Sequence, residues 1–132
     1  MKILIPLLLA VLTLSACAAP AVSASAEYRA IDMEEAIAMM ETEENYLVVD
    51  VRTPEEFAQG HIPGAVNLPN ESIGTEPPAL LPDKNQLIMI YCRSGNRSKQ
   101  ASEKLVKLGY SSIVEFGGII DWPGEVVSGE EK

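Results

Sequence analysis

The sequence predicts an α/β domain with a parallel sheet and helices on both faces. Strand-like and helix-like segments alternate along the chain, which is the order that produces parallel strands joined by helices. Residues 47–51 and 87–91 are continuous apolar runs, as expected for strands buried on both faces of a sheet. A chain of 132 residues predicts one domain with a modest core.

The first half of the domain contains two strand–helix units. Residues 28–31 are expected to form a short opening strand, and Asp32 caps the following helix with Glu35 in a capping-box-like position. Apolar residues at helical spacing form its buried face: Met33, Ala36, Ile37 and Met40. After the strand at 47–51, Thr53 and Pro54 start a short helix that stops at Gly60.

The second half continues the alternation. Residues 65–68 predict another short strand, and residues 70–82 a long connection with one helical turn. The strand at 87–91 leads through a short loop into a helix that begins near Arg97 or Ser98 and closes at Gly109. Its buried face consists of Ala101, Leu105 and Leu108. Residues 113–116 are the last strand, residues 117–118 turn into a segment through Trp122, and the tail after Val127 is polar.

Composition excludes several classes of function. With 10 Lys and Arg against 19 Asp and Glu, the formal net charge is −9, which argues against nucleic-acid binding because that affinity depends on neutralising phosphates. One histidine and two cysteines are too few for a zinc finger or a two-metal site. The few aromatic residues form no base-stacking platform.

The first seventeen residues resemble the signal peptide of a bacterial lipoprotein. Residues 3–14 are an apolar run too short to span a membrane, and Leu14-Ser15-Ala16-Cys17 resembles the lipobox, in which the cysteine is lipidated. The alternative is a plain signal peptide cleaved in the Ala-rich stretch that follows. We interpret residues 18–26 as a tether, 27–128 as the domain and 129–132 as a loose tail. A lipid on Cys17 predicts anchoring on the extracytoplasmic side of the cell envelope.

The candidate site is the loop between the strand ending at Tyr91 and the next helix. Ligands in open α/β sheets bind at the carboxyl ends of strands, and a helix N-terminus there offers convergent N–H groups. Cys92 occupies this position, so its pKa should be lowered and its thiolate should be the nucleophile. The loop also supplies the candidate anion-binding residues Arg93, Ser94, Gly95, Asn96 and Arg97.

Charge supports the same location. Five of the ten basic residues fall within 93–107, so an acidic protein gathers half of its positive charge around one cysteine. Lys99, Lys104 and Lys107 could equally be the solvated face of a helix. The two loop arginines, Arg93 and Arg97, are better placed to bind an anion.

Four motifs, in order, resemble the rhodanese (thiosulfate sulfurtransferase) domain. They are Asp50-Val51-Arg52-Thr53-Pro54-Glu55-Glu56-Phe57, Gly60-His61-Ile62-Pro63-Gly64-Ala65, the loop from Cys92 to Arg97, and Gly117-Gly118 with Trp122. The resemblance covers roughly residues 28–127 and is greatest to small single-domain bacterial members. It implies a rhodanese-like fold with a five-stranded, mainly parallel sheet.

The resemblance also implies a mechanism. Cys92 would take the sulfane sulfur of a small anionic donor such as thiosulfate, and the persulfide would pass it to cyanide or a thiol. No metal or organic cofactor would be needed, and we expect a monomer. Related phosphatases place their arginine six residues after the cysteine, whereas Arg97 is five after Cys92. This shorter loop argues against a phosphatase or arsenate reductase.

Other residues of the motifs are better explained as scaffold. His61 could form a Cys–His pair, but its Gly-His-Ile-Pro-Gly context favours a structural turn. Asp50 and Arg52 lie at a strand end, where Arg52 could pair with Glu55 or Glu56 and Asp50 could hold neighbouring backbone.

Two other functions compete with sulfur transfer. A rhodanese-like module could bind a partner or carry sulfur without catalysis, but the chain retains Cys92 and a basic loop, which favour activity. A thiol redox protein is disfavoured because no resolving cysteine accompanies Cys92.

Overall fold

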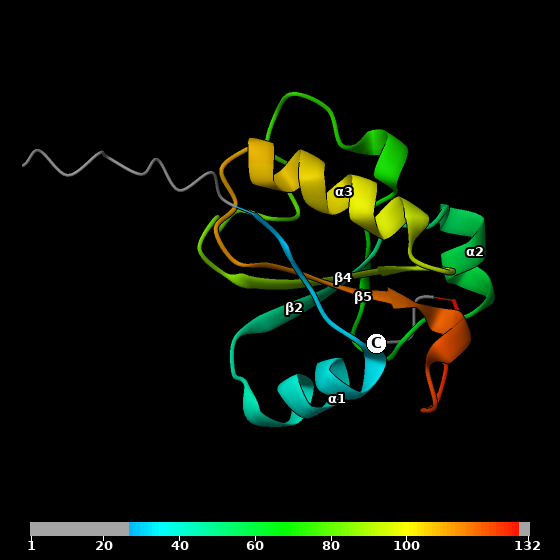
Figure 1. Cartoon of the computed structure of the whole chain (residues 1–132). Coiled ribbons are helices and arrows are strands. Elements are labelled where there is room, and N and C mark those ends of the chain that lie inside the picture. Colours follow the sequence, from blue (N-terminus) through cyan, green and yellow to red (C-terminus); the bar gives the residue numbers. More distant parts are fainter. Residues whose placement is uncertain (1–26, 130–132) are drawn as a thin grey trace, which may run out of the picture.

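The computed structural model describes residues 27–129 (Figure 1). The predicted signal peptide with Cys17, the tether at 18–26 and residues 130–132 lie outside the described residues. In the described part of the chain, no helix combines the length and the apolar character needed to cross a membrane.

Five parallel strands form one sheet in the order β1-β5-β4-β2-β3. The strands are β1 (Arg29–Ala30), β2 (Tyr46–Asp50), β3 (Val66–Asn67), β4 (Leu87–Cys92) and β5 (Ile113–Gly118). The central strand β4 is buried from Ile88 to Cys92, which confirms the prediction from its continuous apolar run. The carboxyl ends of β2, β4 and β5 therefore meet at one edge of the sheet.

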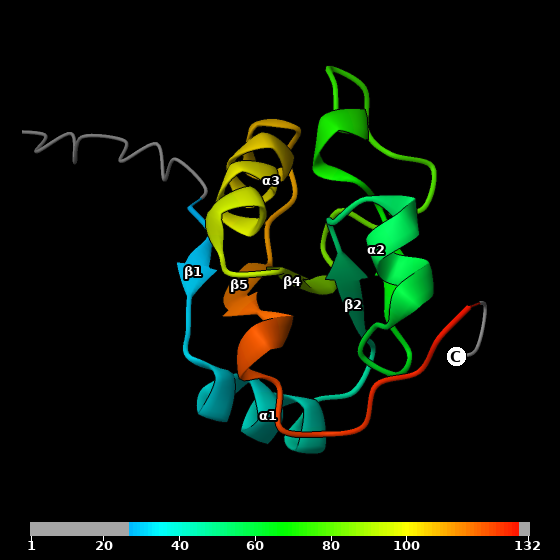
Figure 2. The ribbon, with the colours of Figure 1, turned by 90° about the vertical axis from the view of Figure 1, so that its right-hand side faces the viewer.

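Helices cover both faces of the sheet, as predicted. Figure 2 shows α1 (Met33–Thr42) on one side, and α3 (Asn96–Lys107) with α2 (Pro54–Gln59) on the other. Alternate strand residues supply two cores: Val49, Ile88 and Ile90 pack with α3, while Val48 and Met89 belong to the cluster on the α1 side. This two-sided burial explains why neither strand shows alternating polarity.

Capping residues place the helix ends close to their predicted positions. Asp32 accepts a hydrogen bond from the Glu35 N–H (2.8 Å), and Thr53 forms a capping box with Glu56 at the start of α2. Gly60 ends α2, as predicted. The predicted face of α1 is largely correct, because Ala36 is buried and Met33 and Met40 pack beside it, whereas Ile37 is half-buried outside that cluster.

The structure contains the helical turn predicted in the long connection, but it extends the last strand beyond its predicted end. The long connection contains the expected helical turn as a short 3-10 helix, η1 (Asn70–Ser72). The last strand was expected to end at Phe116, but β5 continues to Gly118 and is followed by a second 3-10 helix, η2 (Ile119–Asp121). Between the pairs Ile90–Glu115 and Cys92–Gly118, β5 has one more residue than β4. This bulge, with Gly117 at φ +91°, allows β5 to stay paired beside the cysteine.

Candidate active site

The Cys92 loop joins the end of β4 to the start of α3. Cys92 is the last residue of β4, and α3 begins at Asn96, one or two residues earlier than predicted. The early start depends on Gly95, which is the N-cap residue and adopts φ +112°, a backbone conformation that glycine allows at little cost. The turn therefore directs the first N–H groups of α3 back toward Cys92.

The Cys92 sulfur lies among hydrogen-bond donors. The Gly95 N–H donates to Sγ at 3.0 Å, and Ser98 Oγ lies 3.4 Å from Sγ. Burial raises the pKa of the Cys92 thiol, but hydrogen bonding with the Ser98 side chain and with the N–H groups of Ser98, Gly95 and Ser94 outweighs it. The pKa of Cys92 is therefore lowered, in the direction that the sequence predicts.

The loop presents its remaining side chains to different surroundings. Cys92 and Gly95 are buried, whereas Arg93, Ser94 and Asn96 are exposed. Solvent-facing side chains thus surround a buried sulfur. Arg93 is exposed, and it takes part in none of the ion pairs found in residues 27–129.

Arg97 is held by a carboxylate that the sequence analysis did not assign to it. Its Nη1 and Nη2 atoms donate to Glu56 Oε1 (2.7 Å) and Oε2 (3.0 Å), which forms a bidentate pair between α3 and α2. The Arg97 hydrogen bonds lower the pKa of Glu56 to about 2. Arg97 therefore sits beside the loop with its charge already neutralised.

Arg52 has a different partner from the one predicted. The expected pairing with Glu55 or Glu56 is wrong, because Arg52 forms a buried ion pair with Asp50 at 2.7 Å. Arg52 also donates to the Gly60 carbonyl oxygen (2.6 Å), and Asp50 accepts from the Arg52 N–H (2.9 Å). The two residues thus fix the chain between β2 and the end of α2, which is a scaffold role.

His61 is packed into the scaffold. Its side chain is fully buried, and its ring stacks on Phe57 with ring centres 3.7 Å apart. His61 Nδ1 lies 2.9 Å from the Phe57 carbonyl oxygen, and the His61 backbone pairs with Val127. These contacts fit the structural turn that its sequence context indicates.

Sequence reasoning missed two residues beneath the loop. Ser98 and Glu115 are both buried, and the Ser98 hydroxyl donates to Glu115 Oε1 at 2.6 Å. The Gly117 N–H donates to the same oxygen at 2.8 Å. A carboxylate within the apolar run Ile113–Phe116 was the available signal, because a charged residue is rarely buried without a specific partner.

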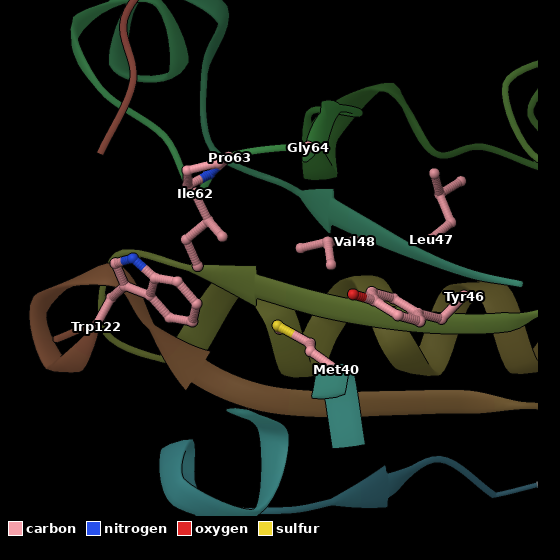
Figure 3. A pocket seen from close by; sticks show the side chains of 8 residues that line it. All are labelled: Met40, Tyr46, Leu47, Val48, Ile62, Pro63, Gly64 and Trp122. Atoms are coloured by element: carbon pink, nitrogen blue, oxygen red, sulfur yellow. The ribbon is translucent and has the colours of Figure 1, made fainter. Parts of the chain in front are cut away.

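A separate apolar groove lies away from these groups. Figure 3 shows its lining, which comes from α1, β2, the turn at residues 62–64 and Trp122. Its lining residues are Met40, Tyr46, Leu47, Val48, Ile62, Pro63, Gly64 and Trp122. None of these lining residues is a thiol, an imidazole or a carboxylate, so the candidate nucleophile Cys92 lies outside this groove.

Comparison with known proteins identifies the family. The rhodanese-like domain matches residues 32–124. The thiosulfate sulfurtransferase PspE of Escherichia coli is 38% identical over 73 residues, which cover 55% of this chain and 70% of that protein. The thiosulfate sulfurtransferase GlpE of Pseudomonas entomophila is 34% identical over 111 residues, covering 80% of this chain and 98% of that protein.

A solved structure agrees with these sequence matches. A rhodanese with anions from E. coli superimposes with a TM-score of 0.58 at 36% identity, covering 64% of this chain and 99% of that chain. The region that matches the family, residues 32–124, includes the strand, loop and helix that carry Cys92. The chain therefore belongs to the rhodanese-like domain family.

Proposed function

We propose that the protein is a sulfurtransferase that moves a sulfane sulfur from an anionic donor such as thiosulfate to cyanide or a thiol through a persulfide on Cys92. The observation that carries the proposal is the sulfur itself: a buried thiol of lowered pKa that receives the Gly95 N–H at the start of α3. A thiolate in such a place is a nucleophile. The relatives that are named thiosulfate sulfurtransferases support the same chemistry.

The reaction would occur in two displacements at sulfur. The Cys92 thiolate attacks the outer sulfur of thiosulfate, the sulfur–sulfur bond of the donor breaks, and sulfite leaves with the bonding electron pair. A thiolate or cyanide then attacks the outer sulfur of the persulfide, and the Cys92 thiolate leaves. N–H groups of the loop favour negative charge on sulfur in both steps.

Binding of the donor would use the positive end of α3 and the loop arginines. Arg93 is exposed and available to a sulfonate group. Arg97 is paired with Glu56, so it would assist only if a donor competes successfully with that carboxylate. The Glu56 carboxylate would therefore oppose the binding of dianions.

The proposed function is tested by the mass of the peptide that contains Cys92. After treatment of the full chain with thiosulfate, we expect this peptide to gain one sulfur atom, and cyanide should remove it as thiocyanate. The peptide that contains Cys17 serves as an internal comparison and should show no cyanide-labile gain. If folded protein shows neither the mass gain nor thiocyanate, the thiosulfate reaction is refuted and a non-catalytic binding or carrier role becomes the better account.

Glu56→Gln should strengthen the binding of thiosulfate. Gln keeps a capping side chain at the third helical position, but it cannot neutralise Arg97. We expect the KM for thiosulfate to fall about 3- to 10-fold, which corresponds to one charge interaction of roughly 1 kcal/mol. Steady-state kinetics at fixed ionic strength measure this change.

The matched control for this variant is Glu55→Gln, which removes the neighbouring carboxylate. Glu55 is exposed, and it takes part in none of the ion pairs found in residues 27–129. Glu56 has a folded pKa of about 2, below its ordinary value of 4.5, so the pair contributes above pH 4.5 and is lost as pH falls toward 2. The effect of Glu56→Gln should therefore be constant between pH 6 and pH 8. An equal KM change in both variants would show a general charge effect instead.

We also propose that the chain is a lipoprotein anchored through Cys17 on the extracytoplasmic side of the cell envelope. The support is the apolar run at residues 3–14 followed directly by Leu14-Ser15-Ala16-Cys17. In bacteria, the wild-type chain should fractionate with membranes, and Cys17→Ser should not. Membrane fractionation of Cys17→Ser at the wild-type level would refute the lipid anchor.

A further inference from the structure

Glu115 is a buried carboxyl group that the reaction as described does not use. It lies on β5 beneath the start of α3 and is 2% exposed. Its Oε1 atom accepts hydrogen bonds from Ser98 Oγ and from the Gly117 N–H. The ion pairs in residues 27–129 are Arg29–Glu35, Arg52–Asp50 and Arg97–Glu56. Because a buried carboxylate is costly without a cation, Glu115 depends on these hydrogen bonds.

Ser98 connects this carboxyl group to the nucleophile. Ser98 Oγ lies 3.4 Å from Cys92 Sγ and 2.6 Å from Glu115 Oε1. Its hydroxyl also lies within reach of the Gly95 carbonyl oxygen (2.9 Å), but a charged carboxylate is the stronger acceptor. The three groups form a continuous chain from sulfur to carboxyl oxygen.

Ser98 has a single hydroxyl proton, so it can donate to Cys92 or to Glu115 but not to both at once. When Glu115 is ionised, this proton points to Oε1, and Ser98 can only accept a hydrogen bond from the Cys92 thiol. A Cys92 thiolate requires the opposite arrangement, in which Ser98 donates to sulfur. If Ser98 donates to the thiolate, an ionised Glu115 loses its hydroxyl donor and keeps only the Gly117 N–H, whereas a protonated Glu115 can itself donate to Ser98.

We propose that Glu115 accepts the Cys92 thiol proton through Ser98. The thiol proton passes to Ser98 Oγ, and the Ser98 hydroxyl proton passes to Glu115 Oε1. The S–H bond breaks, a carboxyl O–H bond forms, the total charge is unchanged and nothing is oxidised or reduced. Its role in sulfur transfer rests on the proposed function: the thiolate would be generated for the attack on the donor without placing a second negative charge beside Glu115.

The charged groups on the packed elements leave Glu115 as the internal proton acceptor. Arg97 of α3 acts on Cys92 through its charge, and Glu56 of α2 is bound to Arg97. On β2, Asp50 is paired with Arg52, and Arg29 of β1 is paired with Glu35. Arg93 in the loop is exposed. In the described structure, Glu115 is therefore the carboxyl group joined to Cys92 by hydrogen bonds.

The test is the pH dependence of Cys92 alkylation by iodoacetamide, measured on the full chain by the mass of the Cys92 peptide. This neutral reagent reports thiolate and needs no sulfur donor, so the result is independent of whether thiosulfate is a substrate. If Cys92 and Glu115 share a proton in wild type, the alkylation rate should stop falling with pH at values below the main thiol titration. This plateau arises because a constant fraction of the molecules then carries the proton on Glu115 and a thiolate on Cys92. Without sharing, the rate falls about tenfold for each pH unit.

Two variants interrupt the hydrogen-bonded path from Cys92 through Ser98 to Glu115 in different ways. Glu115→Gln retains an oxygen that accepts from Ser98 and Gly117 but cannot take a proton, so the plateau should vanish and the rate should fall about tenfold per pH unit. Ser98→Ala retains the Glu115 carboxyl group but removes the hydroxyl that connects it to Cys92, so the alkylation rate at the plateau should fall. Glu103→Gln removes an exposed carboxylate from α3 and should keep the wild-type profile.

Each outcome decides the proposal. A plateau in wild type and in Glu103→Gln that is lost in Glu115→Gln supports it, and a structural role alone would not change the slope of the profile. A plateau that persists in Glu115→Gln overturns it. If Glu115→Gln does not fold, the wild-type profile still decides, because a fall of about tenfold per pH unit without a plateau also overturns it.

Discussion

Replacing Cys92 with serine should abolish sulfur transfer while the fold remains intact. A serine hydroxyl cannot hold a sulfane sulfur as a persulfide, so thiocyanate formation should fall by at least about 10³-fold. The serine oxygen can still accept the Gly95 N–H and contact Ser98, so both polar neighbours keep a partner. We therefore expect the free energy of unfolding to change by no more than about 1–2 kcal/mol.

Cys17→Ser is the matched control, because it removes the other cysteine of the chain. It should keep full activity when purified. Activity is followed by thiocyanate formation, and stability by urea unfolding with an unchanged denaturant slope. Residual turnover in Cys92→Ser well above the uncatalysed rate would mean that another group receives the sulfur.

The loop around Cys92 could be located from the sequence because its features are local. The apolar run at 87–91 marks a buried strand, and the next residues combine a cysteine, a glycine and two arginines where a helix begins. Strand, loop and helix follow one another in the chain, so the position of Cys92 at a helix N-terminus needs no knowledge of the tertiary fold. The start of α3 at Asn96 was missed because the N-cap is Gly95, which has no side chain to signal it.

The partners of the charged residues could not be predicted in the same way. Arg97 and Glu56 are 41 residues apart, and they meet because α2 and α3 lie on the same side of the sheet. Glu115 reaches Ser98 because β5 neighbours β4, which follows from the strand order rather than from any local pattern. The pairing of Arg52 with Glu55 or Glu56 failed for a different reason: its partner Asp50 is only two residues away, but the sequence does not show that both side chains are buried together.

Gly118→Ala should both destabilise the domain and displace the Cys92 loop. A Cβ at residue 118 would lie 1.9 Å from the Arg93 carbonyl oxygen and 2.5 Å from the Ser94 backbone nitrogen. These atoms belong to the backbone, so no side-chain rotation can relieve the contact. Gly118 itself is extended, with φ −142°, so alanine causes no local backbone strain and the cost arises from the loop alone. We expect a loss of about 3 kcal/mol in the free energy of unfolding.

Activity should fall further than stability in Gly118→Ala. Moving the backbone of Arg93 and Ser94 would displace the N–H groups that lower the pKa of Cys92, so the folded fraction should show less thiolate and slower turnover. Gly74→Ala is the matched control, because a Cβ there meets nothing within 4 Å, and its free energy of unfolding should change by no more than about 0.5 kcal/mol. Urea unfolding and the rate of Cys92 alkylation measure the two effects. Wild-type values for both in Gly118→Ala would show that close packing of β5 against the loop does not hold the nucleophile in place.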